Sequence, residues 1–194
     1  MLKEALRYLG IRGEADAETL RLLLECMETV QKVSSPKIVI RRFTPTQFAP
    51  YMEGEDIRAH LKGAREIALM AATLGIGVDT EIKKVQKVDM ARAAGLNACA
   101  AALIEKFCDE NMPDGVPGTG RFSPGYGDYP LTVQPKLLRA VGAEKIGITA
   151  LESCILLPAK SVTAVVPIGK TMACPESKCA GCKKTDCLYR RKQR

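Results

Sequence analysis

Four cysteines near the C-terminus form the clearest pattern of chemically reactive groups in this sequence. They follow the spacing C-x4-C-x2-C-x4-C, at Cys174, Cys179, Cys182 and Cys187. Four thiolates this close in sequence can surround one metal ion or cluster at little cost in chain entropy. In a protein that is not secreted, such a group indicates metal binding rather than disulfide bonds. We therefore predict a metal centre in this tail.

The spacing leaves two kinds of metal centre open. The first three cysteines match the C-x4-C-x2-C spacing of plant-type ferredoxins, although the fourth cysteine lies far downstream in those proteins. Structural zinc sites usually pair two C-x2-C units across a longer spacer, and zinc knuckles normally include one histidine. The single histidine, His60, is distant in sequence and is expected at the surface. From this comparison of spacings we favour an iron–sulfur cluster over zinc, and the nearby basic residues would then offset part of its negative charge.

The loop GTGRFSPGYGDYP, residues 118–130, is a second candidate site. Nine glycines and prolines fall between residues 111 and 130, which predicts a true loop with unusual backbone conformations. Glycine allows a ligand to approach the backbone closely. Arg121 could bind a carboxylate or phosphate through two hydrogen bonds, and Tyr126 could lie against a planar ring. The loop matches neither the P-loop nor the dinucleotide-binding motif, so a surface loop with an arginine salt bridge is the simpler interpretation of these residues alone.

The distribution of charge limits the possible partners. The net charge is +7, and residues 170–194 contain eight basic and two acidic residues, whereas residues 1–169 contain 21 basic and 20 acidic ones. Nucleic-acid binding would therefore depend on the tail, where Tyr189 is the one aromatic residue able to stack on bases. The longest apolar run, residues 67–78, is too short to cross a bilayer, and the N-terminus lacks a signal peptide. We expect a cytoplasmic protein with no membrane partner.

The elements that must position these groups follow from hydrophobic periodicity and from helix-capping residues. Helices are predicted at residues 1–10, 16–33, 79–88, 89–111 and 133–142, and strands at residues 37–43, 145–151 and 161–169. Residues 66–75 fit a buried strand or a short helix, and we favour the strand because Gly75 and Gly77 follow it. The cysteines outside the tail are predicted to be buried, namely Cys26, Cys99, Cys108 and Cys154.

The order of these elements does not alternate as βαβ units. We therefore predict a mixed α+β fold around a largely antiparallel, twisted sheet with flanking helices. Residues 1–169 would form one domain, and residues 170–194 the short four-cysteine tail.

Two separated stretches together resemble the activation domain of cobalamin-dependent methionine synthase. The first is R-x-S-P-G-Y at residues 121–126, and the second is Pro-x-x-Ser-Val-Thr at residues 158–163. The whole chain is similar to stand-alone relatives of that domain, including TLG-x-x-VD at residues 73–79. The sequence departs from the family at residues 127–130, where the family has Pro-Ala-Cys-Pro, and at Val165 and Val166, where it has an aromatic residue.

The resemblance implies a C-shaped α+β domain that binds S-adenosylmethionine in a groove. It implies that Arg121 contacts the carboxylate of this ligand and that backbone groups of Ser123, Pro124, Gly125 and Tyr126 meet the adenine. It also places Ser161 at the binding site and brings Tyr126, the expected catalytic residue, close to a corrin ring. The implied function is reductive reactivation, in which one electron reduces cob(II)alamin and the methyl group of S-adenosylmethionine traps the product as methylcobalamin.

The chain is too short to hold the homocysteine, folate and corrinoid modules as well. We therefore expect it to act in trans on a corrinoid-binding methyltransferase protein, methionine synthase or another, which carries the cobalamin. An iron–sulfur cluster in the tail could deliver the electron that a flavoprotein donor supplies elsewhere. Two other functions remain open from the residues, a nucleic-acid-binding module that uses the basic tail and a ferredoxin-like electron carrier.

The metal prediction can be tested on the purified protein. After anaerobic purification, we expect iron and acid-labile sulfide, together with the visible absorption of an iron–sulfur cluster. Replacing the four tail cysteines with serine should remove both the metal and the absorption. A colourless protein with stoichiometric zinc would contradict the iron–sulfur assignment.

Overall fold

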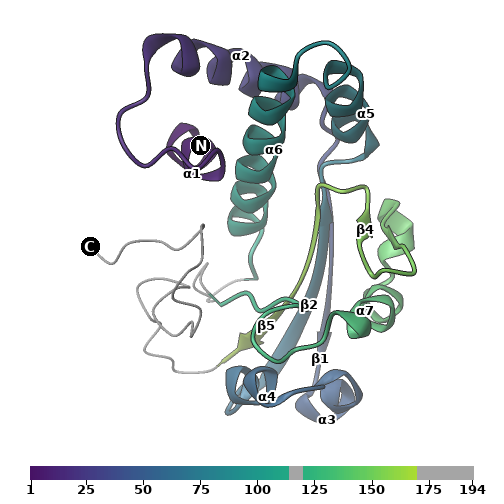
Figure 1. The fold of residues 1–194 in the computed structure, drawn as a ribbon. Helices are drawn as coiled ribbons and strands as arrows, with labels where there is room; N and C mark the ends of the chain where they lie inside the picture. The colour runs from purple at the N-terminus through teal and green to yellow at the C-terminus, as the bar shows by residue number, and fades with distance from the viewer. Residues whose placement is uncertain (114–119, 170–194) are drawn as a thin grey trace.

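The computed structural model describes residues 1–113 and 120–169 (Figure 1), and the four predicted cysteine ligands of the tail lie outside these residues. Its centre is a three-stranded antiparallel sheet in the order β1–β2–β5, formed by Lys37–Phe43, Glu66–Thr73 and Ser161–Ile168. Met70 of the central strand lies opposite Ile40 of β1 and Ala164 of β5. Two short strands, β3 (Thr149–Ala150) and β4 (Leu156–Leu157), form a separate antiparallel pair.

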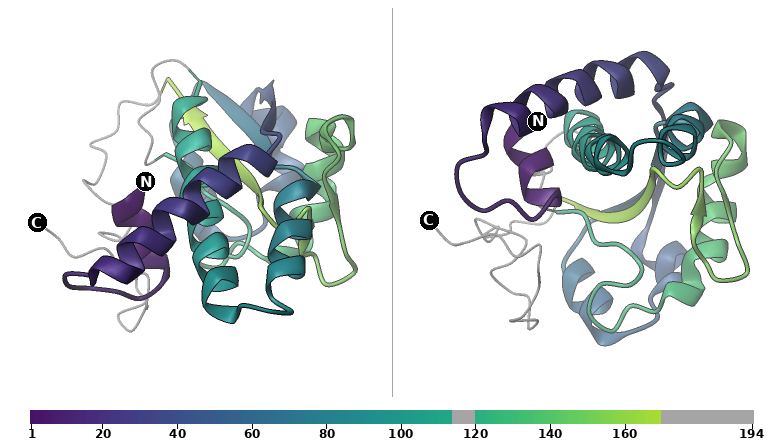
Figure 2. Two further views of the ribbon diagram at one scale, coloured as in Figure 1. Left: turned by 90° about the horizontal axis from the view of Figure 1, so that it is seen from above. Right: turned by 45° about the horizontal axis from the view of Figure 1, so that its top comes forward.

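Helices cover both faces of the three-stranded sheet (Figure 2). One face carries the short helix α1 (Leu2–Tyr8) and the three longest helices, α2 (Ala17–Val33), α5 (Ile76–Val85) and α6 (Met90–Glu110). The other face carries α3 (Pro45–Phe48), α4 (Glu55–Leu61) and α7 (Gln134–Val141), with the 3-10 turns η1 (Ala49–Tyr51), η2 (Leu131–Val133) and η3 (Ala143–Ile146). The architecture confirms the predicted α+β fold around an antiparallel sheet.

The central strand β2 separates two hydrophobic cores. Side chains alternate along a strand. Ala68, Met70 and Ala72 therefore face α1, α2, α5 and α6, whereas Ile67, Leu69 and Ala71 face α3, α4 and α7. All of these side chains are fully buried. A strand covered on both faces is apolar without interruption, and for that reason periodicity alone could not separate a strand from a helix at residues 66–75. The preference for a strand is confirmed.

The predicted starts of the two longest helices are also confirmed. Asp16 accepts a hydrogen bond from the Thr19 backbone N–H at 2.7 Å and caps α2. Asp89 accepts one from the Arg92 backbone N–H at 2.8 Å and caps α6. Such caps satisfy backbone donors that have no partner within the helix. Both long helices therefore begin at the residues that their sequence signals indicate.

Two sequence expectations differ from the structure. Residues 145–151 were predicted as one strand, but only Thr149–Ala150 is extended, because left-handed backbone conformations at Gly142 and Gly147 enclose the turn η3. Cys154 is half-buried, whereas Cys26, Cys99 and Cys108 are buried as predicted. His60, expected at the surface, is half-buried and so stays partly exposed.

A membrane-spanning role finds no support in the described part of the chain, since none of its helices combines the length and the apolar character needed to cross a bilayer.

Candidate functional site

The start of the glycine-rich loop is attached to the edge of the sheet. Phe122 and Val165 exchange two backbone hydrogen bonds, at 2.9 Å from the Phe122 N–H and 2.8 Å from the Val165 N–H. Strand β5 thus pairs with β2 on one side and with Phe122 on the other. The His60 ring stacks on Phe122, with 5.0 Å between the ring centroids, and its Nε2 lies 3.0 Å from the Gly120 carbonyl oxygen. The loop therefore runs beside the strand that contains Ser161.

The loop closes on itself through backbone hydrogen bonds. The Tyr126 N–H donates to the Ser123 carbonyl at 3.1 Å, and the Gly125 N–H donates to the Tyr129 carbonyl at 2.8 Å. Gly125 and Gly127 have φ values of 89° and 53°, which favour glycine. The Gly125 N–H is therefore already hydrogen-bonded within the loop.

Asp128 fastens the loop to helix α4. Its carboxylate accepts hydrogen bonds from the backbone N–H groups of Glu55 at 2.6 Å and Asp56 at 2.9 Å. The N-cap of α4 is Gly54, which has no side chain, so Asp128 supplies the cap from 73 residues away. A Cβ atom at Gly127 would collide with the Asp56 carboxylate, so this position requires glycine.

Tyr129 fastens the loop to the core. Its side chain is 1% exposed, and its hydroxyl donates to the Tyr51 carbonyl at 3.0 Å. Burial raises the pKa of Tyr129, so the phenol stays neutral and keeps this hydrogen bond. Residues 127–129, where the sequence departs from the family pattern, therefore anchor the loop and do not line the pocket described next.

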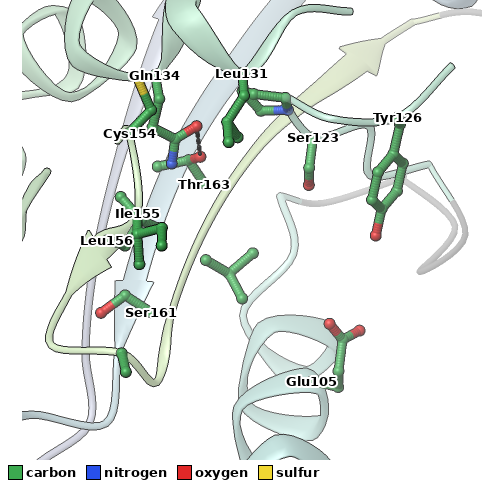
Figure 3. A pocket seen from close by; sticks show the side chains of 13 residues that line it. Glu105, Ser123, Tyr126, Leu131, Gln134, Cys154, Ile155, Leu156, Ser161 and Thr163 are labelled. Atoms are coloured by element: carbon green, nitrogen blue, oxygen red, sulfur yellow. Dashed lines mark hydrogen bonds between the residues drawn. The ribbon is translucent and has the colours of Figure 1, made fainter. Parts of the chain in front are cut away.

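An open pocket of about 330 Å³ lies between the loop, α6, α7 and β5 (Figure 3). Its polar lining residues are Glu105, Ser123, Tyr126, Gln134, Cys154, Ser161 and Thr163. Its apolar lining residues are Pro124, Leu131, Ile155, Leu156, Ala159 and Val162. The pocket thus combines the two stretches that carry the family resemblance.

The structure places most of the predicted ligand-binding residues at this pocket. Ser123, Pro124, Tyr126 and Ser161 line it, whereas Arg121 and Gly125 do not. Three polar lining residues had no sequence signal of a binding site, namely Glu105, Gln134 and Cys154. Only Glu105 could have been noticed, because it lies four residues before Asp109 on the same face of a predicted helix.

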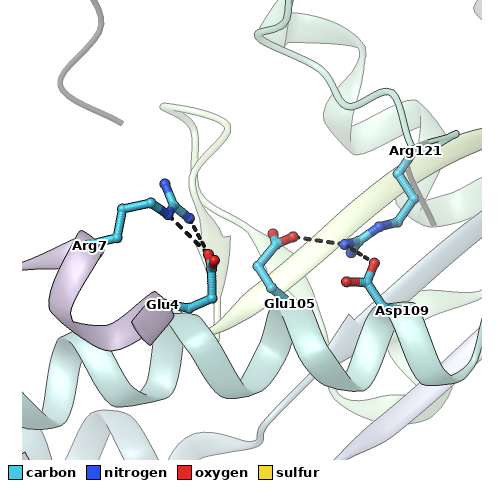
Figure 4. A network of polar contacts seen from close by, with 5 residues as sticks. All are labelled: Glu4, Arg7, Glu105, Asp109 and Arg121. Atoms are coloured by element: carbon cyan, nitrogen blue, oxygen red, sulfur yellow. Dashed lines mark hydrogen bonds and ion pairs between the residues drawn. The ribbon is translucent and has the colours of Figure 1, made fainter. Parts of the chain in front are cut away.

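Arg121 is held by two carboxylates of α6 (Figure 4). Its Nη2 lies 2.7 Å from both Glu105 Oε2 and Asp109 Oδ1, and its side chain is 3% exposed. Its Nε has no hydrogen-bond partner among the described residues. Burial acts to lower the pKa of Arg121, but Glu105, Cys108 and Asp109 outweigh it and the pKa is raised. The guanidinium stays charged, and its contact with a ligand carboxylate remains a prediction.

The electrostatic character of the pocket is set by Glu105. Among the described lining residues it is the only charged one, and no lysine or arginine joins it. Burial, and then the Glu105 charge, raise the pKa of Tyr126, so its hydroxyl is a neutral donor at neutral pH. Because Glu105 and Asp109 share the single positive charge of Arg121, this group keeps a net negative charge beside the pocket, which suits a positively charged ligand.

Residues 73–79 hold the far wall of the pocket in place. The Asp79 carboxylate accepts a hydrogen bond from the Ala159 N–H at 2.6 Å, and the Leu74 N–H donates to the Lys160 carbonyl at 2.9 Å. The Ser161 hydroxyl lies 2.9 Å from the Thr73 hydroxyl. Two of the stretches that carry the resemblance are therefore bonded to each other, and together they fix the start of β5.

The described residues contain no group of three or more histidine, cysteine, aspartate or glutamate side chains placed to bind a metal ion. The predicted metal site depends on the tail cysteines, which lie outside these residues.

Comparison with known proteins gives the fold. No protein-family model matches the sequence, and no curated protein matches it. Among solved structures, the chain is similar to the crystal structure of the MetH reactivation domain bound to AdoHcy. The TM-score is 0.56 and the identity 15%, over 91% of this chain and 76% of that one. The similarity confirms the reactivation-domain fold that the resemblance implied.

The loop anchor can be tested by replacing Asp128 with alanine. Loss of the two capping hydrogen bonds should lower the free energy of unfolding by about 1 kcal/mol, measured by urea denaturation. Hydrogen exchange at residues 125–129 should become faster. Asp16→Ala removes a comparable cap at α2 and serves as the control, with a similar loss of stability and unchanged exchange in the loop. Equal exchange in the two variants would contradict the anchoring role.

The cysteine environments can be compared by alkylation of the native protein. Burial raises the pKa of Cys26, and that of Cys99 to about 12. The thiolate fraction of Cys99 near neutral pH is then about a thousandfold below that of an ordinary thiol. We expect peptide mapping by mass spectrometry to show Cys154, at the pocket, modified before Cys26 and Cys99. Equal rates at these three positions would contradict the structure.

Proposed function

We propose that this chain binds S-adenosylmethionine in the pocket and donates its methyl group to the reduced cobalamin of a separate corrinoid protein. The observation that carries the proposal is the convergence of residues 121–126 and 158–163 on one pocket. This pocket belongs to a fold shared with the MetH reactivation domain, which was crystallised with AdoHcy.

The lining of the pocket agrees with this ligand. S-adenosylmethionine carries a sulfonium and an ammonium charge, and Glu105 supplies the matching negative charge. The nucleoside part can lie against the apolar wall formed by Leu131, Ile155 and Leu156. A volume of about 330 Å³ is within the range of small-molecule sites. The pocket is therefore suited in both charge and size.

In this proposal Arg121 contacts the carboxylate of the ligand, which is the role that the resemblance implies. Its buried Nε is a donor without a described partner, and such a donor costs free energy until it is satisfied. For the ligand carboxylate to satisfy it, the Arg121 side chain would have to turn toward the pocket, which it does not line in the structure. Arg121 also positions Glu105 through the ion pair at 2.7 Å, so both charged ends of the amino-acid group would be met by one network.

The rim of the pocket suits a partner that approaches from outside. Tyr126, Leu131 and Ile155 line the pocket and are still 46%, 43% and 56% exposed. Leu151 and Leu157, near Ile155, are exposed as well. A group of exposed apolar side chains around a cavity is typical of a docking surface. Tyr126 lies at this rim, where the resemblance places the corrin.

The task of the protein would then be positioning. An electron from a donor converts cob(II)alamin on the partner to cob(I)alamin, whose cobalt attacks the methyl carbon as the carbon–sulfur bond breaks and AdoHcy leaves. Holding the sulfonium in line with the cobalt replaces a bimolecular encounter with a fixed geometry. The four-cysteine tail is proposed as the source of the electron.

Binding can be tested by calorimetry with AdoHcy and S-adenosylmethionine. We expect the wild-type protein to bind both and Glu105→Gln to bind about tenfold more weakly or worse, because the amide can still accept a hydrogen bond but lacks the charge that attracts the ligand ammonium. Asp109→Asn is the matched control: it removes the other partner of Arg121 but does not line the pocket, so its affinity should stay within about twofold of wild type.

Two results would overturn the proposal. One is a wild-type protein that binds neither ligand. The other is tight, salt-sensitive binding of an oligonucleotide with no transfer of labelled methyl from S-adenosylmethionine to a reduced corrinoid protein.

A further inference from the structure

We propose that Gln134 selects the base of the bound nucleoside and favours adenine over a 6-oxopurine. This inference rests on the proposed function, because it takes the ligand to be an adenosyl compound. Nothing in the sequence singles out Gln134, and its position at the pocket appears only in the folded chain.

Gln134 is a buried side chain that still reaches the pocket. It is the first residue of α7 and is 4% exposed, yet it lines the cavity. The Thr163 hydroxyl donates a hydrogen bond to its Oε1 at 3.0 Å (Figure 3). Thr163 lies on β5 and is 3% exposed. The amide is therefore held in one orientation by a strand of the central sheet.

The amino group of this amide is not satisfied by the protein. Among the described residues, no hydrogen bond from Gln134 Nε2 is found. Arg121 Nε is the one buried side-chain polar atom without a partner in the described part of the chain, so Gln134 Nε2 is open to the pocket, where a ligand acceptor can take the place of water. Since Oε1 has a second lone pair, the side chain can offer one donor and one acceptor to a ligand.

The position of the amide identifies which part of the ligand it would meet. In Figure 3, Gln134 and Glu105 lie on opposite sides of the pocket, with Ile155 and Leu156 along the wall next to Gln134. The charged amino-acid end of the ligand belongs near Glu105. The uncharged heterocycle then lies against the apolar wall, within reach of the amide.

A primary amide distinguishes adenine from hypoxanthine through hydrogen bonding. Glutamine pairs with adenine by accepting from its 6-amino group and donating to a neighbouring ring nitrogen. Hypoxanthine has a carbonyl oxygen in place of the amino group, so two acceptors would face each other at Oε1. A buried polar site rejects a ligand that leaves its groups unpaired.

The test compares the affinities of AdoHcy and S-inosylhomocysteine, its hypoxanthine analogue, by calorimetry on the full-length protein. Wild type should prefer AdoHcy by roughly tenfold or more. In Gln134→Leu the preference should fall to about one. Thr163→Val leaves Gln134 in place but removes the hydroxyl that orients it, so the preference should be smaller than in wild type. Ile155→Val, which trims the apolar wall, should weaken both ligands equally and keep the ratio.

Each outcome separates this inference from the proposed function. Binding of AdoHcy by wild type, with an unchanged preference in Gln134→Leu, would overturn the role of Gln134 and leave the proposed function standing. Failure of wild type to bind AdoHcy would overturn both. Thermal unfolding of every variant checks for a structural effect, and if Gln134→Leu does not fold, Thr163→Val decides the question: an unchanged preference there counts against the inference.

Discussion

The pocket depends on one pair of backbone hydrogen bonds, between Phe122 and Val165. Strand β5 is the outer strand of a three-stranded sheet, so its free edge is open to pairing. Phe122 occupies that edge at a single residue, and the following loop turns back over the strand. Because the attachment uses backbone groups, Val165 can replace the aromatic residue expected from the family without loss of the contact. This pairing places the loop that forms the second wall of the pocket beside β5.

Side chains then fix the loop from outside the pocket. Asp128 caps α4, Tyr129 enters the core beneath the sheet, and Arg121 pairs with α6. None of the three lines the cavity. Ser123 and Tyr126, which do line it, are therefore carried by a backbone held at several points. A site supported in this way is positioned before its ligand arrives, which reduces the ordering cost of binding.

Patterns among neighbouring residues in the sequence were enough to predict the helices and strands. The site, in contrast, is built from contacts between residues far apart in the sequence. The caps at Asp16 and Asp89 and the alternation of β1 depend on neighbours in sequence, so they could be recognised. The role of Asp128 depends on a helix 73 residues away that begins with a glycine. Gln134 and Glu105 reach the pocket from opposite layers of the fold. The loop itself was identified through its resemblance to a family, because its residue types alone favoured a simple salt bridge.

The division of the molecule by β2 has a mechanical consequence. Glu105 belongs to the helical layer packed on one face of the sheet, and Gln134 belongs to the layer on the other face. A shift of α6 relative to α7 would change the span between the two ends of the pocket. A ligand that touches both ends would connect two layers that are otherwise joined by the sheet and by the glycine-rich loop. Occupancy of the pocket would then reduce the motion of α6 relative to α7.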